Sequence, residues 1–463
     1  MRAYAKIIAL FTGAALLNFF SPFILSRVAL VGGESAAIAS ALWTMTIILG
    51  FGWLCAEYAK GTIFPSFTLQ LVISIVLHDA LAPLSDKVTM IVVICTILAA
   101  VILKSGGDEV ERIHFKTIAL PTILISTLGY IITLFATLAV LLLLGIDGTT
   151  AVLLAAIIGS TDPAALIPTL HSVVFKDRYR RLTNISVAES AINDATGAIF
   201  AGAIIVMIQN GTDMSSISHV LHGMAEVENL IHFTLEIIFG VLAGLVGWAV
   251  MWMYEKHKSC NCETSYDFAI VLAVPIFAFL IAWFMDGNGF LAAFITGLMA
   301  NYNHGNAKFE KTLAIMEAKI DSIAKPVIFM MAGPLISITD LWHTAGLGLV
   351  ISLAFMFIVR PIAVFVSLIF TTMSTREKLF LCVVRETGVI PIVLAVGAVS
   401  QFPELLQLLP LVAWVVTWTL VILPAITPWW ARTLQLTKTK EEIGSSTILN
   451  TMLQTSHASE KIG

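Results

Sequence analysis

Two short stretches decide how this chain is understood: TDP at residues 161–163 and ESAIND at residues 189–194. They place the carboxylates of Asp162, Glu189 and Asp194 inside two successive segments that are otherwise apolar enough to cross a bilayer. An ionisable side chain at the centre of a bilayer costs at least about 2.5–3.5 kcal/mol on insertion scales, so such residues usually mark functional sites. The two stretches therefore predict a membrane protein whose carboxylates carry an ion.

The composition of the whole chain agrees with this prediction. Of its 463 residues, 58% are hydrophobic and 12% are charged. A typical globular domain has about 25% charged residues. The chain has no basic tail and no basic patch interleaved with aromatic residues, as a nucleic-acid-binding protein would have. We therefore expect an all-α polytopic membrane protein that binds no nucleic acid.

Hydropathy predicts about fourteen spans. They lie near residues 5–31, 42–58, 65–82, 88–104, 117–145, 149–172, 183–209, 229–255, 266–284, 287–302, 319–337, 344–371, 377–399 and 407–431. A cleaved signal peptide is the alternative for the first span, but its length and the lack of a small-residue cleavage motif before Gly32 favour a true span.

Basic residues give an independent indication of the topology. Loops after odd-numbered spans hold few of them, whereas loops after even-numbered spans hold Lys104, Arg112, Lys116, Lys176, Arg178, Arg180, Arg181, Lys256, Lys258, Lys308, Lys311, Arg376 and Lys378. By the positive-inside rule both termini are predicted to be cytoplasmic, which requires an even number of spans.

Two predicted spans contain residues that interrupt a helix. Pro163 follows Asp162 in the middle of the sixth span, and Gly388 and Pro391 lie in the thirteenth. Proline removes a backbone hydrogen bond and clashes with the preceding turn. If the first and eighth spans stand apart, spans 2–7 match spans 9–14, and the two interruptions fall at equivalent positions. Paired broken helices in two halves indicate the central site of a transporter.

The segment around residues 189–194 presents its polar side chains in two stripes. Glu189 and Asn193 are four residues apart, as are Ser190 and Asp194, so each pair stacks along one side of a helix. We expect Glu189 to pair with the buried Arg360 of the twelfth span and to hold helices together. Asp194 and Ser190 can then face a different neighbouring helix.

Hard oxygen atoms are what a small cation needs when it loses its water. Asp162, Asp194, the Ser190 hydroxyl and backbone carbonyls freed near Thr161 by Pro163 could supply them. Desolvation and mutual repulsion of two carboxylates both favour their protonated form. A proton and a metal ion would then compete for the same oxygens, which is the minimum chemistry of an exchanger.

A second buried arginine, Arg385, lies in the thirteenth span beside Glu386. It could pair with Glu386 or cap the end of a broken helix, and a gating role is an alternative for both residues. His114, His171 and His304 lie near predicted cytoplasmic span ends. They are candidate pH sensors, with ordinary solvated positions as the alternative.

Taken together, these motifs resemble the signature of NhaP/NHE-type monovalent cation–proton antiporters. The matching order is TDP at 161–163, ESAIND at 189–194, FLAAFITG at 290–297, PVIF at 326–329 before Gly333, RP at 360–361 and IPIVLA at 390–395. The resemblance covers residues 42–430. One departure is VVRETG at 383–388, where the family usually has a Gly-Leu-Arg-Gly run; it adds Glu386.

The resemblance implies a role for each site residue. Asp194 would be the essential cation and proton site and would hold the transported Na⁺ together with Asp162. Ser190 and the Thr161 carbonyl would assist. The bracing residues would be Asn193, Glu189 and Arg360. No cofactor is implied, because the ions are cargo.

The resemblance also implies an inverted-repeat fold with two crossed broken helices, in which a core domain moves against a dimerisation domain of a homodimer. The expected divisions are an extra span and loop (1–41), the exchanger domain (42–431) and a short tail (432–463). Within the domain, repeat one covers 42–209, a linking span 229–255 and repeat two 266–431.

An asparagine at position 193, where electrogenic relatives carry a second aspartate, implies electroneutral exchange of one cation for one proton. The expected function is Na⁺ (or Li⁺) exchange for H⁺ across a plasma membrane. K⁺/H⁺ exchange is the alternative, and a cation channel a more distant one.

Overall fold

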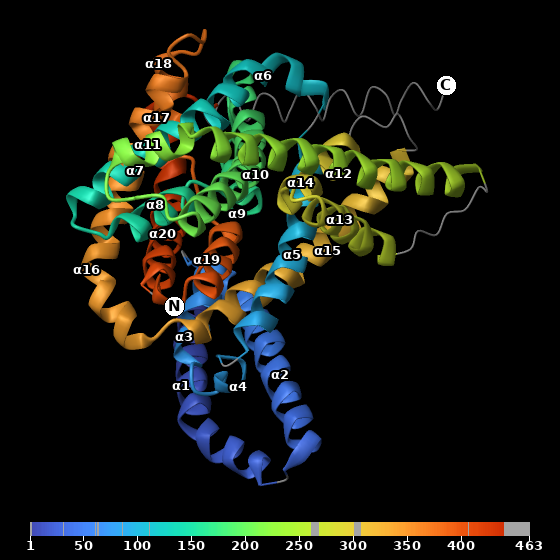
Figure 1. The fold of residues 1–463 in the computed structure, drawn as a ribbon, viewed down its shortest axis with the longest axis vertical. Helices are drawn as coiled ribbons and strands as arrows, with labels where there is room; N and C mark the ends of the chain where they lie inside the picture. The colour runs from blue at the N-terminus through green and yellow to red at the C-terminus, as the bar shows by residue number, and fades with distance from the viewer. Residues whose placement is uncertain are drawn as a thin grey trace, which may run out of the picture.

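The computed structural model describes residues 2–30, 32–60, 62, 64–85, 87–110, 112–260, 268–300, 307–405 and 407–438. Within these ranges the chain is almost entirely helical (Figure 1). The helices are α1 (Arg2–Ala29), α2 (Gly33–Ala59), α3 (Ser66–Val76), α4 (Ala82–Ser85), α5 (Val88–Asp108), α6 (Arg112–Ser126), α7 (Leu128–Leu143), α8 (Gly148–Ile157), α9 (Pro163–His171), α10 (Arg181–Gln209), α11 (Ile217–Ala225), α12 (Val227–Cys260), α13 (Phe268–Phe284), α14 (Gly289–Ala300), α15 (Ala307–Ala332), α16 (Ile338–Ala354), α17 (Arg360–Ser367), α18 (Thr375–Leu381), α19 (Val389–Gln401) and α20 (Leu408–Thr433).

The predicted polytopic all-α class is confirmed. Among the described residues, eight helical segments are long and apolar enough to cross a membrane, and five shorter helices are apolar. Every predicted span overlaps a helix. Span 319–337 overlaps the more polar α15, spans 149–172 and 377–399 each overlap two helices on either side of a break, and the others overlap one of these apolar segments. The short helices α4 and α11 were not predicted, because neither is long enough to register as a span.

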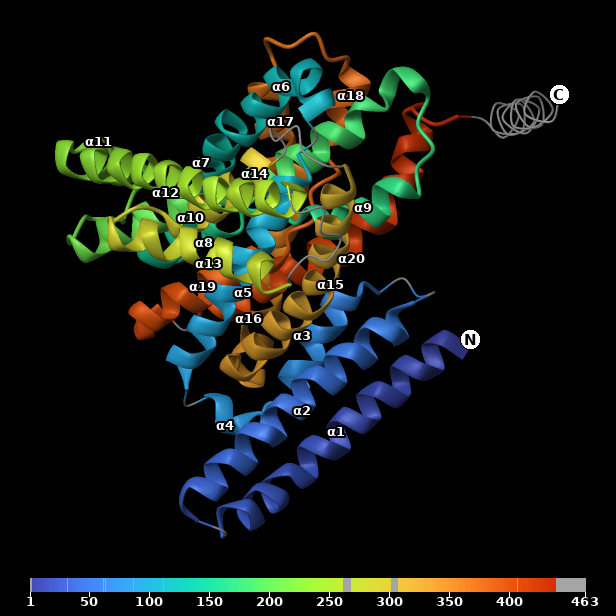
Figure 2. The same cartoon turned by 90° about the vertical axis from the view of Figure 1, so that its right-hand side faces the viewer.

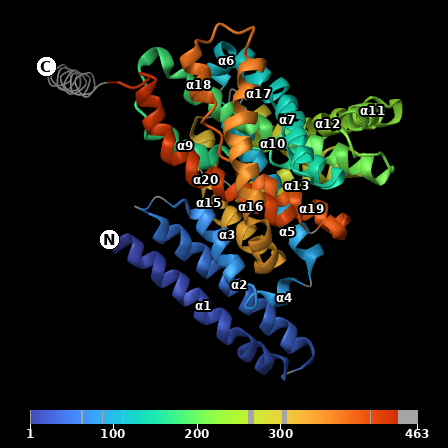
Figure 3. The same ribbon diagram turned by 90° about the vertical axis from the view of Figure 1, so that its left-hand side faces the viewer.

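The outermost helices lie on opposite sides of the molecule. Helices α1 and α2 run side by side along one edge, where α2 packs against α3 and α15 (Figure 2). On the far side, α12 lies against α13 and α14. Helices α8, α9 and α19 of the two interrupted pairs contact α5, α10, α15 and α20 in the middle of the molecule, whereas α18 lies at its top edge (Figure 3).

The two predicted helix interruptions are present, and they touch each other. Helix α8 ends at Ile157 and α9 begins at Pro163, where a missing N–H and a fixed φ suit the first position of a helix. The Asp162 backbone N–H donates to the Glu386 carbonyl at 3.0 Å. A Cβ at Gly388 would overlap the Asp162 side chain, so only glycine allows this approach.

One residue that was predicted to lie in a cytoplasmic loop is buried. Lys104 has no exposed surface, because α5 continues to Asp108. Its ammonium forms ion pairs with Asp108, at 2.5 Å, and with Glu317 of α15. The predicted end of the fourth span at residue 104 is therefore wrong: two carboxylates neutralise the lysine and let the helix continue.

A small antiparallel backbone contact joins two distant segments. Phe175, just after α9, forms an isolated β-bridge with Thr437, just after α20. The Lys176 N–H donates to the Leu436 carbonyl at 2.9 Å, and the Lys438 N–H donates to the Val174 carbonyl at 2.9 Å. The end of α20 is thereby fastened to the end of α9.

Helices α5 and α14 pack closely because each presents glycine to the other. Gly297 lies against the Lys104 carbonyl, and Gly107 lies against the backbone of Phe294 and Leu298. Small residues let membrane helices approach at backbone distance.

We expect Gly297→Ala to lower the free energy of unfolding by about 1–3 kcal/mol, because its Cβ would press on a backbone atom that cannot move aside. The thermal midpoint of the purified protein in detergent measures this. Gly50→Ala is the matched control, since a Cβ at Gly50 of α2 meets nothing within 4 Å. Equal midpoints for the two variants would contradict the packing argument.

Candidate functional site

Asp194 of α10 faces the break between α8 and α9. The Ser160 hydroxyl donates to Asp194 Oδ1 at 2.5 Å, and the Thr161 backbone N–H also donates to this carboxylate. Asp194 is 4% exposed and has no ion-pair partner within the described ranges. Ser160 was not singled out from the sequence, although it directly precedes the TDP stretch.

Asp162 begins α9 and is held by a lysine that the sequence reasoning missed. Lys325 Nζ of α15 lies 3.1 Å from Asp162 Oδ1 and 3.7 Å from Asp321 Oδ2. Both Asp162 and Lys325 are buried. A signal was available: Lys325 is an ionisable residue inside the predicted span 319–337, and the insertion argument applied to Asp162 applies equally to it.

Glu189 forms the ion pair with Arg360 that was expected. Arg360 Nη1 lies 2.6 Å from Glu189 Oε1, and Nη2 lies 2.9 Å from Oε2. The third donor, Arg360 Nε, reaches the Leu381 carbonyl of α18 at 3.0 Å. This bidentate geometry joins α10, α17 and the second broken helix, because arginine presents its donors as a rigid planar fork.

Asn193 links this ion pair to the first break. Its amide nitrogen donates to Glu189 Oε1 at 3.3 Å and lies 3.5 Å from Thr161 Oγ1. Ser190 is also buried, and its hydroxyl has no hydrogen-bond partner among the described residues. Together with Asp162 and Asp194, these residues lie where the two broken helices meet.

Arg385 caps the end of α8 instead of pairing with Glu386. Its guanidinium donates to the Gly159 carbonyl, lies 3.3 Å from Thr133 Oγ1 and stands 5.2 Å from the centre of the Phe355 ring. A positive charge is favourable at the C-terminal end of a helix dipole. Of the two alternatives for Arg385, the helix cap is therefore the one present.

Glu386 lies in the second break and is 1% exposed. Its backbone carbonyl accepts the Asp162 N–H, and the Thr169 hydroxyl of α9 lies close to its carboxylate. The residue therefore joins the two breaks through its backbone.

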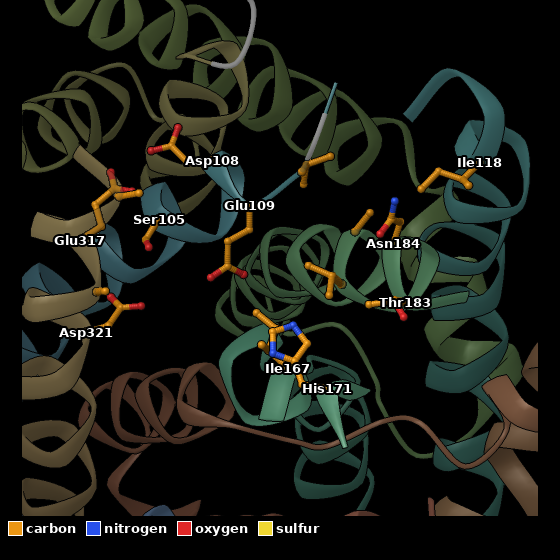
Figure 4. A pocket seen from close by; sticks show the side chains of 15 residues that line it. Ser105, Asp108, Glu109, Ile118, Ile167, His171, Thr183, Asn184, Glu317 and Asp321 are labelled. Carbon is orange, nitrogen blue, oxygen red and sulfur yellow. The ribbon is translucent and has the colours of Figure 1, made fainter. Parts of the chain in front are cut away.

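A cavity of about 610 Å³ opens between α5, α9, α10 and α15. Figure 4 shows acidic side chains along one side of it and His171 on another. The lining carboxylates are those of Asp108, Glu109, Glu317 and Asp321. Because Lys325 contacts both Asp321 and Asp162, it connects the cavity wall to the broken helices.

Of the three candidate histidines, only His171 can be placed. It is exposed and lines the cavity. The side chain of His114 and the whole of His304 lie outside the described residues. A role for His171 in pH sensing stays a prediction.

The arrangement offers hard oxygen ligands at the meeting point of four helix ends. The N-termini of α9 and α19 and the C-termini of α8 and α18 all lie at the two breaks. Such ends expose unpaired backbone N–H and C=O groups. Carboxylates, hydroxyls and freed carbonyls of this kind suit a hard cation better than a soft metal.

Broken helices that meet around buried carboxylates define a multi-pass membrane protein with the architecture of a secondary transporter. The chain belongs to the sodium/hydrogen exchanger transmembrane family, whose model matches residues 37–433. The family resemblance drawn from the motifs is thus confirmed.

Individual relatives carry two different names. The K⁺/H⁺ antiporter NhaP of Alkalimonas amylolytica is 28% identical over 309 residues, which are 65% of this chain and 50% of that protein. The Na⁺/H⁺ antiporter 1 of Methanocaldococcus jannaschii is 26% identical over 378 residues, 77% of this chain and 82% of that protein. The chain spans about half the length of the K⁺/H⁺ antiporters that it matches.

The solved structure of the sodium proton antiporter MjNhaP1 from Methanocaldococcus jannaschii at pH 8 has the same fold. It superposes with a TM-score of 0.70 at 19% identity, covering 86% of this chain and 99% of that one. The expected antiporter fold is therefore confirmed.

Breaking the buried ion pair should be strongly destabilising. Glu189→Gln would leave Arg360 buried without its counter-charge, which costs about 3–5 kcal/mol. We expect a smaller loss of unfolding free energy in the double variant Glu189→Gln/Arg360→Gln, because both charges are removed together. Thermal midpoints in detergent measure these effects.

The matched control is Glu57→Gln, which breaks an exposed pair with Lys60 at 2.6 Å. Exposed pairs contribute only about 0–1 kcal/mol. A double variant that is no more stable than Glu189→Gln would contradict a bracing role for the buried pair.

Proposed function

We propose that this protein is a cation–proton antiporter in which Asp194 alternately carries a monovalent cation and a proton. One observation carries the proposal. Of the three carboxylates in the TDP and ESAIND stretches, Asp162 and Glu189 have basic partners, whereas Asp194 is buried against a hydroxyl and a backbone amide. A buried carboxylate without a counter-charge is costly, so it takes up either a cation or a proton.

Transport follows if Asp194 can change its access from one side of the membrane to the other when it holds a cation or a proton. The empty, charged carboxylate must not make this change. In either loaded form the Asp194 charge is neutralised, and the cost of moving a buried charge is removed. Asp162, Ser190 and the Thr161 carbonyl are proposed to complete the cation shell. Asn193 and the Glu189–Arg360 pair are proposed to hold α10 in place.

The proposed stoichiometry is one cation for one proton. The Asp194 carboxylate accepts one positive charge of either kind, which makes the exchange electroneutral. At that ratio one unit of pH difference corresponds to about 1.36 kcal/mol, enough for a tenfold cation gradient. A second exchanged proton would make the reaction respond to the membrane potential as well, at about 2.3 kcal/mol per 100 mV.

The acid-lined cavity is the proposed route for the cation. It lies at the ends of α5 and α9 that the positive-inside rule assigns to the cytoplasm. A concave surface of one charge raises the local concentration of counter-ions. We further propose a plasma-membrane location, cytoplasmic termini, a homodimer, and the division into residues 1–41, 42–431 and 432–463.

The favoured cation is Na⁺ or Li⁺, with K⁺ as the second candidate. The resemblance to NhaP/NHE-type exchangers and the name of the archaeal relative support Na⁺. The names of the bacterial relatives support K⁺. Both candidates use the same carboxylate.

Loss of the Asp194 carboxylate should abolish exchange. In inverted membrane vesicles with an imposed pH gradient and a pH-sensitive dye, we expect Na⁺, Li⁺ or K⁺ to collapse the gradient for wild type only. Asp194→Asn keeps the size of the side chain while removing its charge. The ranking of the ions decides between sodium and potassium.

Glu404→Gln, which changes an exposed acid, serves as the control and should transport normally. Normal exchange by Asp194→Asn at matched expression would refute the assignment. Cation flux that follows voltage without proton counterflow would indicate a channel.

Competition at a single carboxylate also predicts a specific pH dependence. As the pH falls on the cation-binding side, protons occupy Asp194 and the half-saturating cation concentration should rise, by up to about tenfold per pH unit. The maximal rate at saturating cation should change much less. Initial rates at several pH values test this, and a half-saturating concentration independent of pH would exclude competition.

A further inference from the structure

Lys325 is a buried charge that the exchange reaction, as proposed above, does not use. Its ammonium lies 3.1 Å from Asp162 Oδ1, at the point where the two breaks meet. It is also within electrostatic range of Asp194. A cation that enters this site therefore meets a positive charge as well as the two carboxylates.

The position of Lys325 is fixed by neighbours of opposite charge. Asp162 lies on one side and Asp321, one turn earlier on α15, lies on the cavity side at 3.7 Å. Glu109 also acts on the lysine from the end of α5. The ammonium is thus held between Asp162 at the breaks and Asp321 on the cavity wall.

Counting formal charges shows what the lysine changes. Asp162 and Asp194 carry two negative charges, and Lys325 reduces the charge of this cluster to one. Glu189 and Arg360 cancel each other in an ion pair, the formal charges of Arg385 and Glu386 sum to zero, and the other two acids near the lysine, Asp321 and Glu109, line the cavity. One monovalent cation therefore neutralises the cluster of Asp162, Lys325 and Asp194.

Without the lysine, two carboxylates would face each other in a buried, oxygen-rich site. Such a charge and ligand set is what Ca²⁺ selects. Specificity often depends on a repulsive element directed against the wrong ligand. With the ammonium in place, a bound monovalent cation leaves the cluster neutral, whereas a divalent cation leaves an uncompensated positive charge buried in it, which is costly.

We propose that Lys325 is a specificity-determining residue that excludes divalent cations from the Asp162–Asp194 site. It acts by holding the site to one uncompensated negative charge. The inference rests on the proposed cation site, and it assigns to that site the rejection of Ca²⁺ by a built-in charge.

The test measures Ca²⁺ binding directly, so that it does not depend on transport. Binding stabilises the folded protein by mass action. Purified full-length protein in detergent is titrated with CaCl₂ while its thermal midpoint is followed. We expect wild type to show no Ca²⁺-specific stabilisation, and Lys325→Gln to bind Ca²⁺ at least about tenfold more tightly. Lys325→Arg keeps the charge and should behave as wild type.

Lys104→Gln is the matched control. Lys104 is a second buried lysine near the cavity, and it pairs with Asp108 and Glu317 instead of Asp162. Equal gains of Ca²⁺ binding in Lys104→Gln and Lys325→Gln would assign the effect to the cavity as a whole and overturn the proposal. Lack of any gain in Lys325→Gln would also overturn it.

Proton flux in liposomes provides the second readout. Ca²⁺ should inhibit Na⁺- or K⁺-dependent flux by Lys325→Gln at concentrations that leave wild type unaffected. If wild type shows no cation-dependent flux at all, the proposed exchange is refuted, while the Ca²⁺ titration still decides the role of Lys325.

A further pair of variants covers the case in which Lys325→Gln does not fold. Asp162→Asn alone leaves the lysine facing Asp194, so the site has no net charge. Asp162→Asn/Lys325→Gln removes both partners and restores one negative charge. We expect the double variant to bind Na⁺ at least about tenfold more tightly than Asp162→Asn, again by thermal stabilisation. Equal Na⁺ binding by the two would overturn the proposal.

Discussion

The contact between the two helix breaks is the constraint on which the rest of the structure depends. In a bilayer, backbone groups that leave a helix must find partners inside the protein. Here the Asp162 N–H uses the Glu386 carbonyl, and Arg385 covers the Gly159 carbonyl at the end of α8. Each break thus supplies hydrogen-bond partners for backbone groups of the other. Gly388 is required at this point, because any side chain would occupy the space of Asp162.

Buried charge is distributed around this contact so that most of it is balanced. Glu189 pairs with Arg360, and Asp162 pairs with Lys325. Asp194, the third carboxylate of the TDP and ESAIND stretches, receives hydrogen bonds from the Ser160 hydroxyl and the Thr161 amide. Ion pairs hold the helices, while Asp194 is the group on which the proposed exchange depends.

Much of the fold could be predicted, because membrane spans and helix breaks have local signals. Pro163 and Gly388 mark the interruptions, and the Glu189–Arg360 pair follows from the cost of burying either charge alone. Lys325 was missed although it stands inside a predicted span, because its partner at the breaks, Asp162, is not indicated by any local pattern. Lys104 was assigned to a loop, because hydropathy does not register that Asp108 and Glu317 neutralise it. The helix cap by Arg385 depended on the crossing geometry, which no single segment specifies.

The β-bridge between Phe175 and Thr437 has a mechanical consequence. It couples the C-terminal end of α20 to the C-terminal end of α9. An ion pair between Lys438 and Asp177 at 3.0 Å reinforces this link. A displacement of the first broken helix would pull on residues that follow α20. A fluorescent reporter attached there would register any displacement of α9 without a label placed in the helices themselves.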